Sequence, residues 1–503
     1  MELSKAIRIV LATFRRRPAD ILPFYILGLA VPGIVRVVSF LGIGLTLAYL
    51  YVTGRIDLFI EELGLVDTQP PDPETEPEAF LDWAESLQPV FESVITLTSV
   101  SILVLTFAVT ILGMVILTAA VSAGQIGAVF STLRRERGNV GGIAAFRGHW
   151  LQFVGLYLLE FILFMTISAV LIGIVVVTAL ISVAAAIFVG IFAGLLWLGL
   201  ILGIRALFAF APVAVIVDDT TVFGSLRASG SFIRNEFMSA VGYYVISVAV
   251  LTGFAGFSST LAFIGAPTIA AVLSFLLITP ALDMLKTTFF GEFREAINPP
   301  ESPESGVLQQ TKSGMQRGLQ EMTVFVKQTA GLHFLALGTM VAGFAMGWAA
   351  AAPLIGEVET SIAARIEGII PPVAALEFFG NNWTVSMVTA FSGVAAGIPA
   401  AASLWFNGVV FAIVARLEVS MIELIAFVIP HGIIEIPAII IAGALGYYLG
   451  IETWRAWRGR VTRREFADTL ERSFWIVIGI GILIGIAALI EGFISPFYFR
   501  LFL

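Results

Sequence analysis

Long runs of Leu, Ile, Val, Ala and Phe recur along the whole chain. A helix needs about 20 apolar residues to cross a bilayer. These runs are continuous rather than alternating, and in lipid each segment must satisfy its own backbone hydrogen bonds, so we expect helices and not barrel strands. The pattern predicts about eleven membrane spans. They are residues 21–52, 93–123, 151–180, 183–216, 238–262, 264–283, 332–352, 384–403, 405–429, 432–451 and 474–495.

Composition supports the same fold class. Hydrophobic residues make up 58% of the 503 residues and charged residues 13%, whereas a soluble domain carries roughly 25% charged residues. We therefore expect an all-α, polytopic transmembrane helical bundle. The absence of cysteine excludes disulfides, thiolate metal sites and a thiol nucleophile. The first apolar run is too long for a signal peptide and no cleavage pattern follows it, so we expect a retained membrane segment.

Basic residues form five clusters, and all five fall on the same side of the membrane if the spans are counted as above. The clusters are Arg15, Arg16 and Arg17; Arg134, Arg135, Arg137 and Arg147; Arg227 and Arg234; Arg294, Lys312 and Lys327; and Arg455, Arg458, Arg460, Arg463, Arg464 and Arg472. Basic residues are in excess on the cytoplasmic side. The pattern predicts a multi-pass protein of the cell membrane with a cytoplasmic N-terminus and an external C-terminus.

Two polar segments divide the chain. Residues 57–92 are rich in Asp, Glu and Pro, which is typical of an acidic external hairpin with a disordered or Pro-stiffened tip. Residues 296–324 begin with a Pro- and Ser-rich stretch, which predicts a flexible cytoplasmic linker. We therefore expect a six-span domain at residues 1–295 and a five-span domain at residues 325–503.

The C-terminal half contains an ordered set of polar and glycine motifs. They are Asn381-Asn382, Asn407-Gly408, His431-Gly432 followed by Glu435, and Glu491 near the end of the last span. Over about residues 325–500 this set resembles the stage II sporulation protein M family. The resemblance implies a helical membrane module of about five spans, which in spore formers holds cell-wall hydrolases. The chain departs from that family by its long N-terminal extension.

The N-terminal half has a weaker resemblance. Residues 212–219 close a span and residues 225–237 follow as an amphipathic cytoplasmic helix. This arrangement is similar to the helical membrane domain of some glycerophosphodiester phosphodiesterases. Their catalytic domain is absent here, so the likeness implies a fold and not an activity.

His431 and Glu435 are four residues apart and therefore share a helix face. An ionisable pair in a span indicates a proton relay, a metal ligand or catalysis, or else a polar pair that fixes packing. The nearest candidates for further ligands, Glu418 and Glu423, have no recognised ligand spacing, so no metal site is predicted. Asn381 and Asn407 are expected to join His431 and Glu435 in one polar cluster.

Several smaller features have two interpretations. Asn381 and Asn382 either cap a helix or donate to a neighbouring span. Asn407-Gly408 marks either a close helix crossing or a break, and residues 384–417 are then either two half-helices or one straight span and the start of another.

Charged residues within the spans also need partners or a route to water. Arg205 is expected to lie near a polar end or to pair with Glu160, and Glu491 to reach the interface. For each of these charges, structural pairing is preferred over a functional role. Arg416 and Glu418 indicate a shorter helix followed by an interfacial segment over residues 419–429.

The preferred interpretation is a non-enzymatic membrane scaffold or complex subunit. Its expected partners are the lipid bilayer and other membrane or envelope proteins, with no cofactor and no nucleic acid. The alternative is a transporter or channel subunit that needs a separate partner, because broken helices and buried charges are typical of permeation paths. An intramembrane hydrolase is the weakest alternative, since no catalytic constellation can be assembled.

Overall fold

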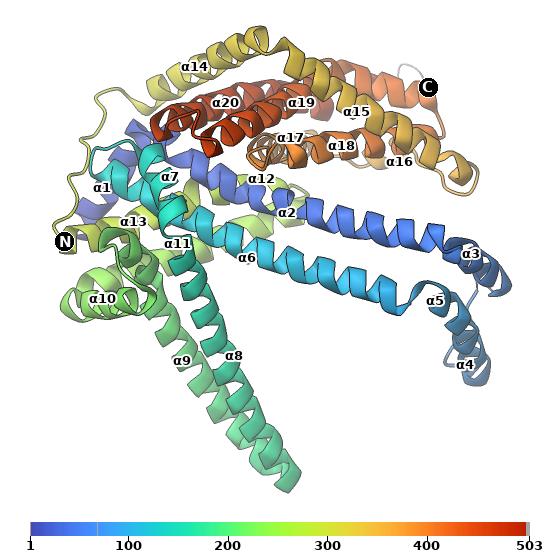
Figure 1. The fold of residues 1–503 in the computed structure, drawn as a ribbon, viewed down its shortest axis with the longest axis horizontal. Coiled ribbons are helices and arrows are strands. Elements are labelled where there is room, and N and C mark those ends of the chain that lie inside the picture. The colour runs from blue at the N-terminus through green and yellow to red at the C-terminus, as the bar shows by residue number, and fades with distance from the viewer. Residues whose placement is uncertain (1, 68, 499–503) are drawn as a thin grey trace. The chain divides into compact units, whose positions relative to one another are not determined.

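The structure is a computed structural model that describes residues 2–67 and 69–498. Within these residues, ten helices are long and apolar enough to cross a membrane, which confirms the predicted all-α, multi-span class (Figure 1). They are α2 (Pro18–Val52), α6 (Leu97–Leu133), α8 (Trp150–Ile181), α9 (Val183–Val217), α11 (Phe237–Ile264), the continuous run of α12 (Pro267–Leu273), η1 (Ser274–Ile278) and α13 (Thr279–Phe293), α15 (Ala330–Ala350), α18 (Ile398–Leu417), α19 (Met421–Trp457), and α20 (Arg463–Phe493) with α21 (Ser495–Tyr498).

The chain forms two compact units, Pro32–Val115 and the remainder. The smaller unit contains parts of α2 and α6 with α3 (Arg55–Leu65), α4 (Pro77–Ser86) and α5 (Gln88–Val94) between them. The predicted acidic hairpin at residues 57–92 is thus largely helical, and α3 packs against α5. Proline is favoured at the first position of a helix, and Pro77 occupies that position in α4.

The larger unit begins with α1 (Leu3–Arg16) and includes α7 (Gly138–Gly148) and α10 (Val222–Asn235). The α10 helix corresponds to the amphipathic helix that the sequence predicts there. The Thr221 side chain caps it by accepting from the Gly224 N–H. On the face toward α9, Phe232 is fully buried and the Ser229 hydroxyl donates to the Leu207 carbonyl at 2.6 Å.

The structure differs from the predicted linker at residues 296–324. Residues Val307–Gln328 form helix α14, which packs on α20. Its buried residues Gly318, Met322 and Phe325 recur at helical spacing, and a Cβ on Gly318 would lie 3.0 Å from the Gly479 backbone N. The Gln and Ser content predicts a flexible chain, but these residues at helical spacing form a face through which the segment packs on α20.

The predicted spans 384–403 and 405–429 are wrong in their boundaries. Helix α17 (Pro371–Ser392) ends at a turn, and α18 begins at Ile398. Ala396 and Gly397 have φ of 58° and 76° in this turn, a left-handed conformation that reverses the chain direction. Residues 384–417 are therefore neither one straight span nor two half-helices, but the end of α17 followed by α18.

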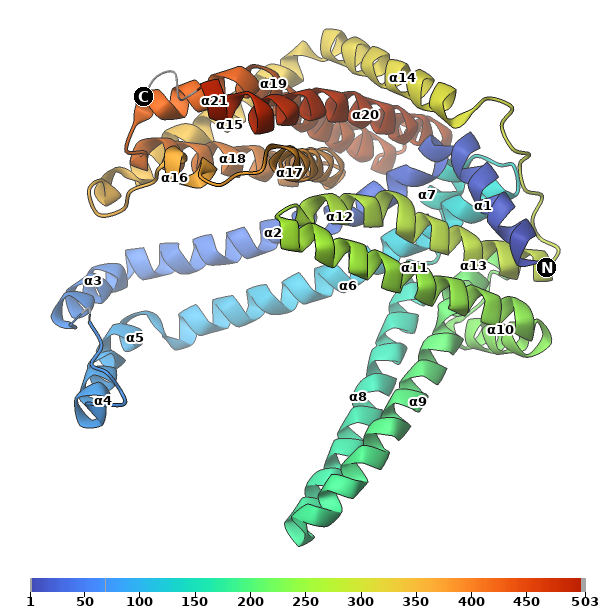
Figure 2. The same cartoon turned by 180° about the vertical axis from the view of Figure 1, so that it is seen from behind.

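Helix α17 packs against α20, and both belong to the C-terminal group of helices with α18 and α19 (Figures 1 and 2). Near one end a Cβ on Gly492 would lie 2.9 Å from the Pro371 carbonyl oxygen, and further along the Trp383 indole N–H donates to the Val477 carbonyl at 3.2 Å. The contact covers about fifteen residues of α20, or roughly 22 Å. Helix α17 is not among the ten candidate spans of the described residues, one fewer than the eleven predicted. Its polar residues lie in a helix on which α12, α18, α19 and α20 pack.

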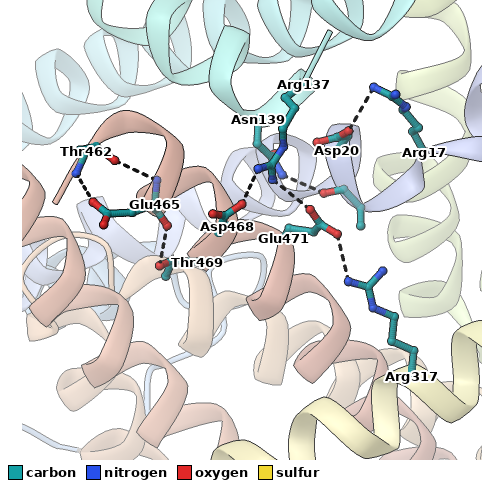
Figure 3. Close-up of polar contacts among 11 residues, drawn as sticks. Arg17, Asp20, Arg137, Asn139, Arg317, Thr462, Glu465, Asp468, Thr469 and Glu471 are labelled. Carbon is teal, nitrogen blue, oxygen red and sulfur yellow. Dashed lines mark hydrogen bonds and ion pairs between the residues drawn. The ribbon is translucent and has the colours of Figure 1, made fainter. Parts of the chain in front are cut away.

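Ion pairs join several segments at one end of the larger unit (Figure 3). The Arg137 guanidinium binds the Asp468 carboxylate and, at 3.0 Å, the Glu471 carboxylate. Glu471 also accepts from Arg317 of α14 at 3.0 Å, and Arg17 lies 3.7 Å from Asp20 nearby. Members of the first, second and fifth basic clusters therefore lie at the same end of this unit, as Arg472 of α20 also pairs there with α14.

Candidate functional site

Five polar side chains meet inside the C-terminal module. Asn382 comes from α17, His431 and Glu435 from α19, Glu491 from α20 and Ser495 from α21. The ligand atoms of His431, Glu435 and Glu491 all lie within 4.8 Å of one another. Segments more than 100 residues apart in the sequence thus build one site, because α17 and α20 both pack on α19.

His431 is the centre of the cluster, and only 6% of its surface is exposed. Its Nδ1 lies 3.0 Å from the Ser495 hydroxyl oxygen, and its ring packs edge-on against Phe427 at 5.4 Å. We assign the tautomer in which Nδ1–H donates to Ser495, because the other nitrogen faces two carboxylates. Nε2 lies 4.0 Å from Glu435 Oε2 and 3.9 Å from Glu491 Oε1.

Glu435 is held by the asparagine pair. Asn382 donates its side-chain N–H to Glu435 Oε1 at 2.9 Å, and Asn381 donates to Asn382 Oδ1 at 2.9 Å. Oε2 of Glu435 remains directed at His431. Of the two interpretations of the asparagines, the interhelical hydrogen bond holds. Capping is wrong, because Pro371 and Pro372 begin α17 ten residues earlier.

Glu491 does not extend toward the interface as expected from its position near the chain end. Its side chain is 12% exposed, and Oε2 is buried with no hydrogen-bond partner among the described residues. The helix continues to Phe493, and the α21 segment that follows places Ser495 at 0% exposure. This segment brings the Ser495 hydroxyl to His431, whose other ring nitrogen faces Glu491.

Asn407 and Gly408 lie apart from the cluster. The Asn407 amide donates to the Ser403 carbonyl of its own helix at 2.8 Å. A Cβ on Gly408 would lie 2.1 Å from the Met340 carbonyl oxygen. This motif therefore marks a close crossing of α15 and α18, and the expected joining of Asn407 to His431 and Glu435 is wrong. Gly432 is buried in α19 beside His431.

The three other span charges singled out in the sequence have specific partners. Arg205 and Glu160 form the expected pair at 2.9 Å. The Arg416 guanidinium stacks over Trp348 at 4.5 Å, and Glu418 accepts from the Ile362 N–H at 2.8 Å. The predicted interfacial segment 419–429 is wrong, because α19 begins at Met421 and is continuous.

Sequence reasoning missed a second buried polar group, in the N-terminal half. Lys286 Nζ lies 2.7 Å from Asp283 Oδ1, and the Tyr25 hydroxyl donates to Asp283 Oδ2 at 2.9 Å. Both charged side chains are less than one fifth exposed. The spacing of Asp283 and Lys286, three residues apart on α13, was a usable signal, but the predicted span ended at residue 283.

The two buried groups suit different chemistry. Asp283 and Lys286 neutralise each other within α13, and the Tyr25 hydroxyl of α2 donates to this pair. His431, Glu435 and Glu491 combine one nitrogen and two carboxylate ligands, which can hold a proton or a divalent cation.

Residues 336–496 match the family model of Stage II sporulation protein M. The match confirms the resemblance of the C-terminal module and includes every residue of the polar cluster. The likeness of the N-terminal half to the glycerophosphodiester phosphodiesterase membrane domain stays a prediction. Neither the search of curated proteins nor that of solved structures found a match.

Proposed function

Because its residues 336–496 match stage II sporulation protein M, we propose that this chain is a non-enzymatic membrane scaffold, or complex subunit, that holds another membrane or envelope protein. The family match carries this proposal. The bilayer is its solvent, and nucleic acid is not among its partners. The N-terminal half is an extension that enlarges the membrane body of the complex.

An apolar groove on the C-terminal module supports the proposal. It lies along α17 and α20 and is lined by Phe379, Trp383, Ile486, Leu489 and Phe493 among others. The rings of Phe379 and Trp383 stack at 5.2 Å, which gives a rigid wall. The groove follows two adjacent helices and is lined almost entirely by apolar side chains, so it suits a transmembrane helix of the partner, with its apolar side chains packed against the rings.

Filling the groove should release the partner. We expect Leu489→Trp to lower the amount of co-purified partner about tenfold, because a bulky ring would occupy the helix position. The measurement is quantitative mass spectrometry of the tagged full-length chain, isolated from its own membranes in lipid nanodiscs. The control is Val410→Trp, a similarly exposed apolar position on α18. Isolation of the wild-type chain alone, or equal partner yield from both variants, would contradict the proposal.

A transporter or channel subunit is the second candidate. The observation that favours it is the buried group of His431, Glu435 and Glu491 within membrane-crossing helices, since such residues often mark ion or proton paths. Flux into liposomes that contain the purified chain, lost in Glu491→Gln, would favour this candidate over the scaffold.

The proposed orientation has a cytoplasmic N-terminus and an external C-terminus in the cell membrane. It counts α17 as an eleventh crossing helix, and it is supported by the ion pairs that place Arg17 and Arg137 close together (Figure 3). Arg472 pairs with Glu321 of α14. Reporter fusions after Ser302 and after Thr462 should both give a cytoplasmic signal. An external signal at either position would overturn the orientation.

A further inference from the structure

We infer that His431, Glu435 and Glu491 form a binding site for a first-row divalent metal ion such as Zn²⁺ or Mn²⁺. This inference differs from the sequence-based expectation of no metal site, and it is independent of the scaffold role. Glu418 and Glu423, considered as further ligands, are not in this group; the third ligand comes from α20 instead.

The distances are close to those of a metal centre. Zinc lies about 2.0–2.2 Å from its nitrogen and oxygen ligands, so two ligand atoms at a tetrahedral angle are about 3.4 Å apart. Nε2 of His431 lies 3.9 Å from Glu491 Oε1 and 4.0 Å from Glu435 Oε2. All three ligand atoms lie within 4.8 Å of one another, so rotation of the flexible glutamate side chains would bring them to a shared ion.

The surrounding hydrogen bonds orient the ligand atoms. Ser495 holds Nδ1 of His431, which leaves the lone pair of Nε2 directed at the carboxylates. Asn382 holds one oxygen of Glu435 and leaves the other free for a metal. Metal-binding histidines and carboxylates usually have such outer-shell partners. Oε2 of Glu491 is buried without a partner among the described residues, so it is available as a second oxygen ligand.

Charge also favours a cation. Within the described part of the chain, His431 is the only ion-pair partner of either Glu435 or Glu491. Two carboxylates in a low-dielectric site cost considerable free energy unless a cation or protons neutralise them. A divalent ion with two carboxylates and a neutral imidazole gives a site with no net charge.

The ligand set indicates which ion binds. Mg²⁺ and Ca²⁺ prefer shells made entirely of oxygen, whereas an imidazole nitrogen with carboxylates suits Zn²⁺, Mn²⁺ and related ions. We therefore expect Zn²⁺ and Mn²⁺ to bind and Mg²⁺ and Ca²⁺ to compete poorly.

The test uses the full-length chain in lipid nanodiscs, stripped with a chelator and dialysed against ZnCl₂ or MnCl₂. Metal content is measured by mass spectrometry, and the melting temperature is recorded with and without metal. Wild type should retain a single ion per chain and melt at a higher temperature when loaded. Glu491→Gln and His431→Ala should lower the affinity at least ~100-fold, and Ser495→Ala by ~10- to 100-fold, because ligand and outer-shell losses differ in this way.

Glu452→Gln is the matched control. Glu452 is a buried carboxylate on the same helix as His431, but it pairs with Arg455 at 2.8 Å, so its replacement should leave metal binding unchanged. If Glu491→Gln does not fold, Glu491→Asp keeps the charge and should bind more weakly than wild type. The proposal is overturned if wild type retains no more metal than His431→Ala, or if Glu491→Gln melts higher than wild type whether or not metal is present, since the cluster then shares protons instead.

Discussion

Replacing Gly343 or Gly408 with valine is expected to destabilise the C-terminal module by at least ~3 kcal/mol, because overpacking costs 1–3 kcal/mol even where neighbours can move. A Cβ on Gly343 would lie 2.0 Å from the Trp405 carbonyl oxygen, and one on Gly408 would lie 2.1 Å from that of Met340. The obstructing atoms belong to the backbone, so α15 and α18 would have to separate.

Thermal unfolding of the purified chain in detergent measures this effect. Gly338→Val is the control, since Gly338 lies in α15 and its Cβ position has no atom within 4 Å. All these substitutions add the same β-branched side chain to a helix, so the change in helix propensity is the same in the variants and the control. Equal melting temperatures for Gly343→Val and Gly338→Val would show that the helix crossing is not as close as described.

Lys286→Met is expected to cost about 3–5 kcal/mol, because it leaves the Asp283 carboxylate buried without its cation. Asp283 is 13% exposed and would keep only the hydrogen bond from Tyr25. The double variant Asp283→Leu with Lys286→Met should recover most of the loss, since both charges are then absent.

The same unfolding experiment, with a denaturant series in mixed micelles, gives the free energies. Lys5→Met is the control, because the ion pair of Lys5 and Glu292 is about half exposed and such pairs contribute about 0–1 kcal/mol. A Lys286→Met loss as small as that of Lys5→Met would mean that water reaches Asp283.

The membrane helices could be predicted from the sequence where apolar residues dominate, since length and hydropathy alone identify them. The position of helix α17 could not be predicted because four other helices pack on it and give its polar residues partners, so its residues need not be apolar. The polar stretch around Asn381 and Asn382 therefore suggested a helix start rather than a helix middle. Helix α14 was missed for a related reason, since its buried face depends on Gly479 of a distant helix.

The candidate site could be predicted only within one helix. His431 and Glu435 share a face by their spacing, which a sequence reveals directly. Their partners Asn382 and Glu491 come from other helices, and only the packing of α17 and α20 on α19 brings them together. Asn407 is polar as well and was therefore expected to join the cluster. Its side-chain amide instead donates to the Ser403 carbonyl, one turn earlier in its own helix.

Site-specific photo-crosslinking from the groove in intact membranes tests the scaffold role most directly. A photoreactive residue at Leu489 should capture a second polypeptide of defined mass, whereas the same residue at Val410 should capture lipid, because both positions are exposed but only Leu489 lines the groove. We expect a discrete adduct at Leu489 that disappears when Ile486→Trp fills the groove. Lipid adducts alone at both positions would contradict it.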